Sequence, residues 1–373
     1  MREAAEIGLG KTAQRGYHLR DVAIVPSRRT RDVDDVSTAW QLDAYQFGIP
    51  CVAHPSDAIM SPATAIGLGQ LGGLGVLNAE GLWTRYEDPS KLLAELAGPG
   101  DEAEATRRLQ EAYAEPIRPE LIGERVRQLR DGGGTVAVRV SPQHTLTLAP
   151  VILDAGVDLL VVQGTIVSAE HVSTSDQPLN LKEFIADLDL PVIAGGCTTY
   201  QTALHLMRTG AAGVIVGIGA DRWATTDPVL GIRVPMATAI AEAAAARRDY
   251  LDETGGRYVH LIADGEVRTS GDIARALGCG ADAVMLGEPL SRAVEAPAGG
   301  AWWHSAASHP KLPRGAFRPA RAGLGSLERL LYGPADQPDG TLNLFGGLRR
   351  AMAKCGYRDL KEFQKVGLLI DGA

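Results

Sequence analysis

The stretch from Val216 to Pro235 has the composition of a loop that carries chemistry at the end of a buried strand. It reads VGIGADRWATTDPVLGIRVP, an apolar run, a glycine turn and then a polar loop with two adjacent threonines. The centre of this loop, however, holds Arg222, Trp223 and Ala224, which offer no thiol, hydroxyl or imidazole as a nucleophile. The loop has therefore either lost a catalytic residue or never had one.

A second group of residues could bind an anion. The segments ADGEVRTSGD and LGEP follow two later apolar runs, and backbone amides near Gly265, Gly271 and Gly287 could cradle a phosphate at a helix N-terminus. The alternative is that these glycines only turn the chain. Both readings remain open at the level of sequence.

Short, nearly continuous apolar runs precede these polar segments, as expected of strands that are buried on both faces. Eight such runs occur: PCVAH (50–54), GLGVLN (73–78), TVAVRV (135–140), LLVVQG (159–164), PVIAGG (191–196), GVIVGIG (213–219), VHLIADG (259–265) and AVMLGE (283–288). Helical text separates them, and one helix is expected to begin with Ser270 as its N-cap.

Eight alternating β and α units predict a (β/α)8 barrel, also called a TIM barrel. An open doubly wound sheet is the alternative, but no G-x-G-x-x-G motif opens a first helix. The interval 79–134 after the second strand predicts a helical insertion, and residues 302–373 a C-terminal extension that packs on the barrel. Catalytic residues of such barrels lie at the C-terminal ends of the strands.

Composition excludes several classes of partner. The net charge of −8 argues against nucleic acid and against anionic membranes. The cysteines Cys51, Cys197, Cys279 and Cys355 form no C-x-x-C pair or metal-binding pattern, so we expect reduced thiols in a cytoplasmic protein. The first residues contain no apolar signal-peptide core, and no apolar run is long enough to span a membrane.

Several segments together resemble one known family. IADGEVRTSGDIARALGCGADAVMLGEPL, GAAGVIVGIGADRWATT, LGGLGVLN, the opening YHLRDVAIVPSRRTRDVDDVS and the C-terminal LFGGLRRAMAKCGYRDLKEFQK are similar, in the same order, to segments of the IMP dehydrogenase / GMP reductase family. The resemblance covers roughly residues 16–366, and it is nearest to short actinobacterial relatives of IMP dehydrogenase.

The resemblance implies an activity, cofactors and an assembly. It implies a single barrel domain over residues 1–373 without the inserted nucleotide-sensing CBS domains. Family members are tetramers or octamers that transfer hydride between C2 of a purine mononucleotide and NAD or NADP, and they bind potassium. A role in GMP biosynthesis would follow. If the protein is instead a silent relative, a true IMP dehydrogenase is the partner that we expect it to associate with.

When the family's motifs are aligned with this sequence, the catalytic loop of this chain departs from the family pattern. The family's nucleophilic cysteine, which forms a covalent bond to C2, aligns with Ala224, and its phosphate-binding serine aligns with Arg222. Its potassium loop maps to Gly219, Asp221 and Ala224. A methyl group cannot replace a thiolate. Thr225 and Cys197 remain as other candidates for catalysis.

The implied nucleotide site is only partly retained. Family positions that bind nucleotide correspond to Asp264, which holds the ribose hydroxyls, and to Gly265, Gly287 and Ser56. Two further phosphate positions carry carboxylates.

These carboxylates are Glu266, in place of a glycine, and Glu288, in place of a serine. Each would repel a phosphate.

Cys197 and His54 need separate weighing. Cys197 is the first residue of a Cys-Thr-Thr sequence after the fifth strand, where a thiol could reach a ligand. No base accompanies this cysteine, so a small buried residue is the simpler interpretation. His54, with no metal partner visible in sequence, is expected to form a hydrogen bond at the rim. Two hypotheses result: an oxidoreductase of this family with reduced or absent turnover, or a silent relative acting as a structural or regulatory partner or a ligand sensor.

Overall fold

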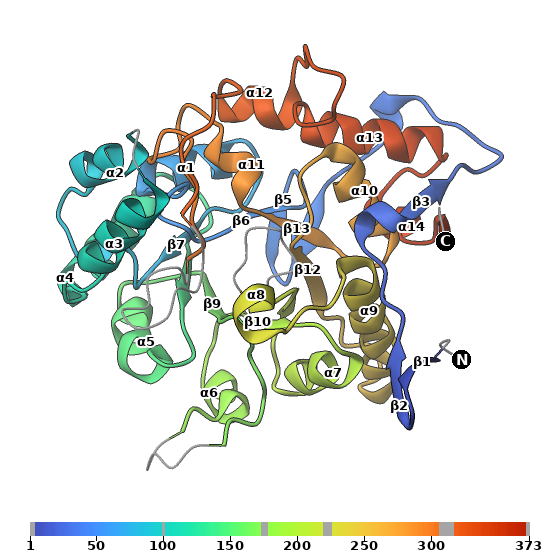
Figure 1. The fold of residues 1–373 in the computed structure, drawn as a ribbon, viewed down its shortest axis with the longest axis horizontal. Helices are drawn as coiled ribbons and strands as arrows, with labels where there is room; N and C mark the ends of the chain where they lie inside the picture. The colour runs from blue at the N-terminus through green and yellow to red at the C-terminus, as the bar shows by residue number, and fades with distance from the viewer. Residues whose placement is uncertain (1–3, 99–100, 173–177, 219–225, 306–316, 371–373) are drawn as a thin grey trace.

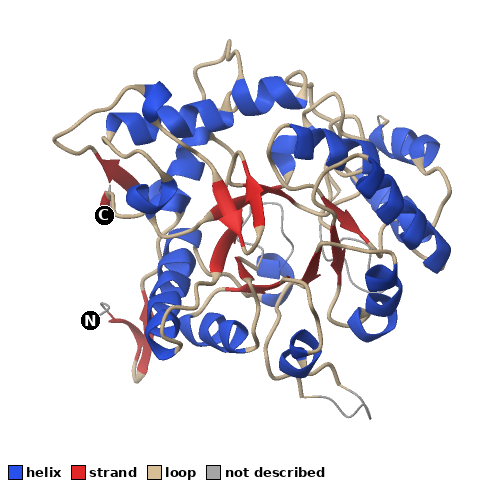
Figure 2. Cartoon of the chain, turned by 180° about the vertical axis from the view of Figure 1, so that it is seen from behind, coloured by secondary structure: helices blue, strands red, loops and turns tan. Residues whose placement is uncertain are grey.

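The computed structural model describes residues 4–98, 101–172, 178–218, 226–305 and 317–370. Within them, a parallel sheet of eight strands forms the centre of the molecule and helices surround it (Figure 2). Its strands are β6 (Cys51–Ala53), β7 (Val76–Asn78), β8 (Ala137–Val140), β9 (Leu159–Gln163), β10 (Val192–Cys197), β11 (Gly213–Val216), β12 (His260–Asp264) and β13 (Ala283–Leu286). All eight predicted strands are therefore present.

The sheet closes into a barrel. Strand β6 pairs with β13, and an isolated parallel bridge between Val52 and Leu74 joins β6 to the start of the β7 segment. The strands carry mostly small and branched apolar side chains that are fully buried, which is why their sequence reads as unbroken apolar runs. The (β/α)8 barrel is confirmed.

Helices form the outer ring (Figure 1). They are α1 (Pro62–Gln70), α4 (Pro119–Asp131), α5 (Thr145–Asp154), α6 (Leu181–Ala186), α7 (Tyr200–Arg208), α9 (Met236–Glu253), α10 (Ser270–Gly278) and α13 (Leu344–Lys354), with the short α8 (Thr226–Leu230) and α11 (Glu288–Ser291) after β11 and β13. Helix α13 packs on α10 and thus completes the ring on the side of β13.

The interval after β7 is helical, as the sequence indicates. It contains the 3-10 turn η3 (Leu82–Thr84), α2 (Ser90–Ala97), α3 (Glu102–Ala112) and the ring helix α4. Tyr113, at the end of α3, turns its side chain into the core. The insertion therefore reaches the barrel mouth instead of standing away from it.

A strand near the start of the chain pairs with the last described strand. Strand β3 (Val22–Val25) pairs antiparallel with β14 (Gly367–Ile370). Between α13 and β14, helix α14 (Leu360–Phe363) brings Lys361 Nζ to 2.7 Å from an oxygen of the buried Asp282. A hairpin of β4 (Trp40–Leu42) and β5 (Tyr45–Phe47) packs at the N-terminal end of the strands, where its Leu42 is fully buried and Trp40 Nε1 lies 3.4 Å from His260 Nδ1 at the start of β12.

One local expectation was wrong by one residue. The N-cap of α10 is Thr269, not Ser270. The Thr269 hydroxyl accepts a hydrogen bond from the Asp272 amide at 3.2 Å, and the Asp272 carboxylate accepts one from the Thr269 amide at 3.1 Å. This reciprocal capping box selects the threonine because the acidic residue stands three positions after it.

Among the described residues, no helix has both the length and the apolar character needed to cross a membrane.

Candidate functional site at the barrel mouth

The C-terminal ends of β10, β11 and β12 lie so close together that side chains are excluded from two positions. A Cβ placed on Gly196 would come within 1.9 Å of the Gly217 carbonyl oxygen. Gly217 has a φ of +137°, and a Cβ there would come within 1.9 Å of the Asp264 carbonyl oxygen. These glycines hold Asp264 at a fixed place in the mouth.

Asp264 is partly buried at the end of β12 and faces Gln163 from β9. The Gln163 amide donates to Asp264 Oδ2 at 3.2 Å and to Met285 Sδ at 3.4 Å. Gly265 follows with a φ of +137°. Asp264, to which the resemblance assigns ribose binding, thus stands in the mouth, at the place where a barrel enzyme holds its substrate.

Glu266 is engaged by the N-terminal segment. Its carboxylate lies 2.5 Å from His18 Nδ1 and accepts a hydrogen bond of 2.8 Å from the Leu19 amide. Glu266 has a φ of +58°, a conformation that costs a non-glycine residue about 1 kcal/mol or more. The two contacts offset that cost, since hydrogen bonds to a carboxylate are among the stronger ones.

Glu288 also has a partner inside the chain. Its carboxylate is 3.2 Å from Arg321 Nη1, although Arg321 is half exposed. Both carboxylates at the predicted phosphate positions therefore have partners within the chain. These partners, His18 and Arg321, stand far from them in the sequence, and no local motif marks them.

Trp302 covers the glycine that follows β13. A Cβ on Gly287 would come within 2.7 Å of the six-membered ring of Trp302. The same indole packs edge-on against His54, with ring centroids 5.3 Å apart. Trp302 thus occupies space beside the Gly287 amide, the amide proposed from the sequence to bind phosphate.

Ser56 is fully buried and faces away from solvent. Its hydroxyl donates to the carbonyl oxygen of Trp303, and the Trp303 indole donates to the Tyr113 hydroxyl at 3.1 Å. Tyr113 in turn donates to Asp57. Burial raises the pKa of Asp57 to about 6, although the bond from Tyr113 opposes this shift. These hydrogen bonds join three parts of the chain: the segment after β6, the helical insertion and the C-terminal segment.

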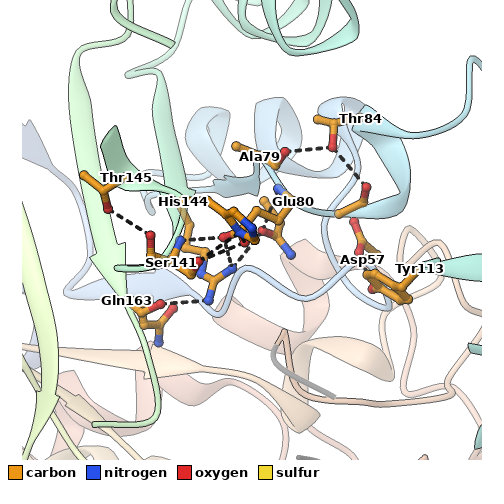
Figure 3. A network of polar contacts seen from close by, with 12 residues as sticks. Asp57, Ala79, Glu80, Thr84, Tyr113, Ser141, His144, Thr145 and Gln163 are labelled. Atoms are coloured by element: carbon orange, nitrogen blue, oxygen red, sulfur yellow. Dashed lines mark hydrogen bonds and ion pairs between the residues drawn. The ribbon is translucent and has the colours of Figure 1, made fainter. Parts of the chain in front are cut away.

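A polar network lines the mouth on the side of β7 and β8 (Figure 3). Glu80 pairs with the buried Arg139 at 2.8 Å, contacts His144 Nδ1, and accepts a hydrogen bond from the Ser141 hydroxyl at 2.9 Å. Burial disfavours the Glu80 anion, but Arg139 and His144 outweigh burial and lower its pKa to about 2. The hydrogen bond that Glu80 accepts from His144 raises the pKa of His144. His144 contacts both Ser141 and Glu80 through the same ring nitrogen, Nδ1. The three residues therefore do not form a nucleophile–base–acid relay.

Two histidines meet above the strand ends. His54 Nε2 lies 3.0 Å from His304 Nε2, so one ring donates to the other. Burial lowers the pKa of His54 well below its ordinary value and that of His304 to about 4. Both rings are neutral at physiological pH. The hydrogen bond expected for His54 is present, but no local pattern pointed to His304.

Cys197 lies at the end of β10 and is only 2% exposed. Burial raises the pKa of its thiol to about 12, so it is protonated at physiological pH and a poor nucleophile. The loop positions Gly219, Asp221, Arg222, Ala224 and Thr225 lie outside the described residues.

Comparison with known proteins shows which family the chain belongs to. The family model described as the IMP dehydrogenase / GMP reductase domain matches residues 16–316. The chain belongs to this family. It is similar to an uncharacterized oxidoreductase of Mycobacterium leprae, 62% identical over 98% of this chain and 99% of that protein, and to one of Mycobacterium tuberculosis, 61% identical over 98% and 100%.

A solved structure extends the likeness. The crystal structure of an IMP dehydrogenase/GMP reductase-like protein from Corynebacterium glutamicum superimposes with a TM-score of 0.94 at 55% identity, over 99% of this chain and 98% of that one. The expected nearness to short actinobacterial relatives is confirmed by these names.

Three features stand at the positions that the family resemblance assigns to phosphate. Glu266 is a carboxylate with a backbone amide bound to it, Glu288 is a second carboxylate, and an indole covers Gly287. Trp302, His18 and Arg321 are the residues that sequence reasoning missed.

Proposed function

We propose that this family member does not carry out thiol-dependent hydride transfer at C2 of IMP or GMP, and that it acts as a structural or regulatory barrel in purine nucleotide metabolism. The observation that carries the proposal is that carboxylates with partners inside the chain stand at the positions that the resemblance assigns to phosphate. The Glu266 carboxylate accepts from the Leu19 amide and contacts His18, as a bound anion would. Ala224 at the nucleophile position supports the same conclusion.

The test is turnover. Purified protein is mixed with IMP and NAD or NADP, or with GMP and NADPH, with and without potassium, and NAD(P)H absorbance is followed. We expect no change above background in the wild type or in Ala224→Cys, because restoring the thiol leaves the phosphate positions blocked. An active IMP dehydrogenase assayed in parallel is the positive control. Clear wild-type turnover would refute the proposal, and its loss in Cys197→Ala would identify the thiol responsible.

The proposal includes an assembly, carried over from the family resemblance. We propose a homotetramer or a stacked octamer, since the family's opening and C-terminal segments are retained here although the catalytic loop is not. A rigid barrel that presents one patch to its neighbour suits closed cyclic symmetry. Light scattering should give about four or eight times the chain mass of 39.4 kDa. A monomer mass at micromolar concentration would contradict this. Co-purification with an IMP dehydrogenase would test the partner.

A second candidate is oxidoreduction of a different substrate at the same mouth. It is favoured by the retained Asp264, whose carboxylate is oriented by Gln163, and by the oxidoreductase names of the similar mycobacterial proteins. NAD or NADP would then be the hydride carrier. Binding of either cofactor, measured by calorimetry without any purine nucleotide, separates this candidate from a silent barrel.

A further inference from the structure

Three metal-ligating side chains converge at the barrel mouth. His54 follows β6, Asp264 ends β12, and His304 belongs to the segment after Trp302 and Trp303. One ligand atom from each lies within 4.8 Å of the others. No function assigned above uses these three groups together.

The spacing of the two histidines fits a shared ion. Their Nε2 atoms are 3.0 Å apart. Two bonds of about 2.0–2.1 Å from one ion span roughly 3 Å when they meet near a right angle. The carboxylate of Asp264 closes the remaining distance by rotation of its side chain. Coordination would replace the hydrogen bond that now joins the rings.

The positions of these side chains are fixed by neighbours. His54 is 1% exposed and packs edge-on against Trp302, which Gly287 admits because it lacks a Cβ. The next residue, Trp303, is held through its carbonyl oxygen by the buried Ser56 hydroxyl. The two histidines are therefore held in place and bind an ion without a large ordering cost. Asp264 accepts one hydrogen bond of 3.2 Å from the Gln163 amide, which its rotation toward the ion would break.

The local charge also permits a cation. Of the described residues, Arg139 is the positive group that acts on both rings, and Glu80 forms an ion pair with it at 2.8 Å. The Asp264 carboxylate then supplies a negative ligand.

We propose that His54, His304 and Asp264 bind one divalent transition-metal ion at the barrel mouth. Two imidazoles and one carboxylate suit Zn²⁺, Co²⁺ or Fe²⁺, whereas Mg²⁺ and Ca²⁺ prefer all-oxygen sites. Three protein ligands leave at least one coordination position for water or for a ligand that enters the mouth. The inference goes beyond the proposed function and does not depend on whether the protein has turnover.

The test uses untagged full-length protein stripped with EDTA and titrated with Zn²⁺ in a calorimeter. We expect one zinc ion per chain. His304→Ala and Asp264→Asn should each weaken binding by at least about tenfold. The matched control is His205→Ala, an exposed histidine of α7, which should bind zinc as the wild type does. Circular dichroism without zinc shows whether each variant is folded.

A second readout is the visible absorption of Co²⁺, which reports the ligands directly. Wild-type protein with one equivalent of Co²⁺ should show ligand-field bands that His304→Ala loses. The proposal is overturned by the lack of a saturable zinc site, by unchanged affinity in Asp264→Asn and His304→Ala, or by loss of binding in His205→Ala, which would place the zinc on the surface.

Discussion

Removal of the two mouth carboxylates should convert a surface that rejects phosphate into one that accepts it. In Glu266→Gly, Glu288→Ser the contacts to His18 and Arg321 are released, and the two negative charges that would repel an anion are removed. The wild type should bind IMP or GMP with a Kd of about 1 mM or weaker, equivalent to about −4 kcal/mol.

The size of the gain follows from charge and burial. The two carboxylate side chains are 12% and 13% exposed, so bulk water screens them poorly. A unit charge about 4 Å from a phosphate costs roughly 1 kcal/mol in water and about 4 kcal/mol at an effective dielectric constant of 20. His18 and the half-exposed Arg321 offset part of this. A net gain of about 1.4 kcal/mol or more, at least tenfold in Kd, is therefore expected.

The indole of Trp302 sets a limit on that gain. Because it lies against Gly287, the double variant alone should not reach the affinity of an unobstructed site, and addition of Trp302→Ala should tighten binding further. Calorimetry with IMP measures each step. The control is Glu253→Gly, Glu183→Ser, which removes two acidic charges elsewhere on the barrel. A micromolar Kd for the wild type, or equal tightening in the control, would refute the reasoning.

Three further outcomes are expected. The pKa of Asp57 in the folded protein is raised to about 6, so ionisation of this side chain lowers the stability of the wild type as pH rises from about 4 to 6. Over that interval the stability of Asp57→Asn relative to wild type, measured by urea unfolding, should increase by about 2–3 kcal/mol. A difference that does not change with pH would contradict the assignment. Cys197 is buried and its pKa is raised to about 12, so its thiol should resist iodoacetamide at pH 8 in the folded protein and react in urea. Mass spectrometry of the peptide that contains Cys197 measures the labelling. Rapid labelling of the folded protein would count against the burial of this thiol. Glu80→Ala leaves Arg139 buried without its ion pair and should lower the free energy of unfolding by about 3–5 kcal/mol. As a control, Glu87→Ala, at an exposed position, should lower it by less than about 1 kcal/mol. Equal effects of the two substitutions in thermal unfolding would mean that the buried pair contributes little.

The fold was predictable from the sequence for a physical reason. Strands buried on both faces contain hardly any polar residue, so each appears as an isolated apolar run, and the count of eight with intervening helices favours a closed barrel. The N-cap of α10 was misplaced because Thr269 and Ser270 are both good capping residues; the position of Asp272 distinguishes them.

The contacts of the mouth were much harder to predict. Glu266 was identified by position, but its partner His18 stands 248 residues earlier, and neither residue belongs to a pattern that would join them. His54 and His304 are likewise 250 residues apart. Sequence reasoning finds the groups that one loop supplies. Groups that different loops bring together depend on the completed barrel.

The pairing of β3 with β14 has a consequence for how the chain reaches its native state. Residues Val22–Val25 meet Gly367–Ile370, so this sheet closes a loop of well over three hundred residues. The entropic cost of closure grows only slowly with loop length, but so distant a contact must form late. During synthesis, Val22 has no strand partner until Ile370 has been made. A ribosome-bound chain that lacks this last strand should therefore expose a sheet edge to which chaperones, or other chains, can bind.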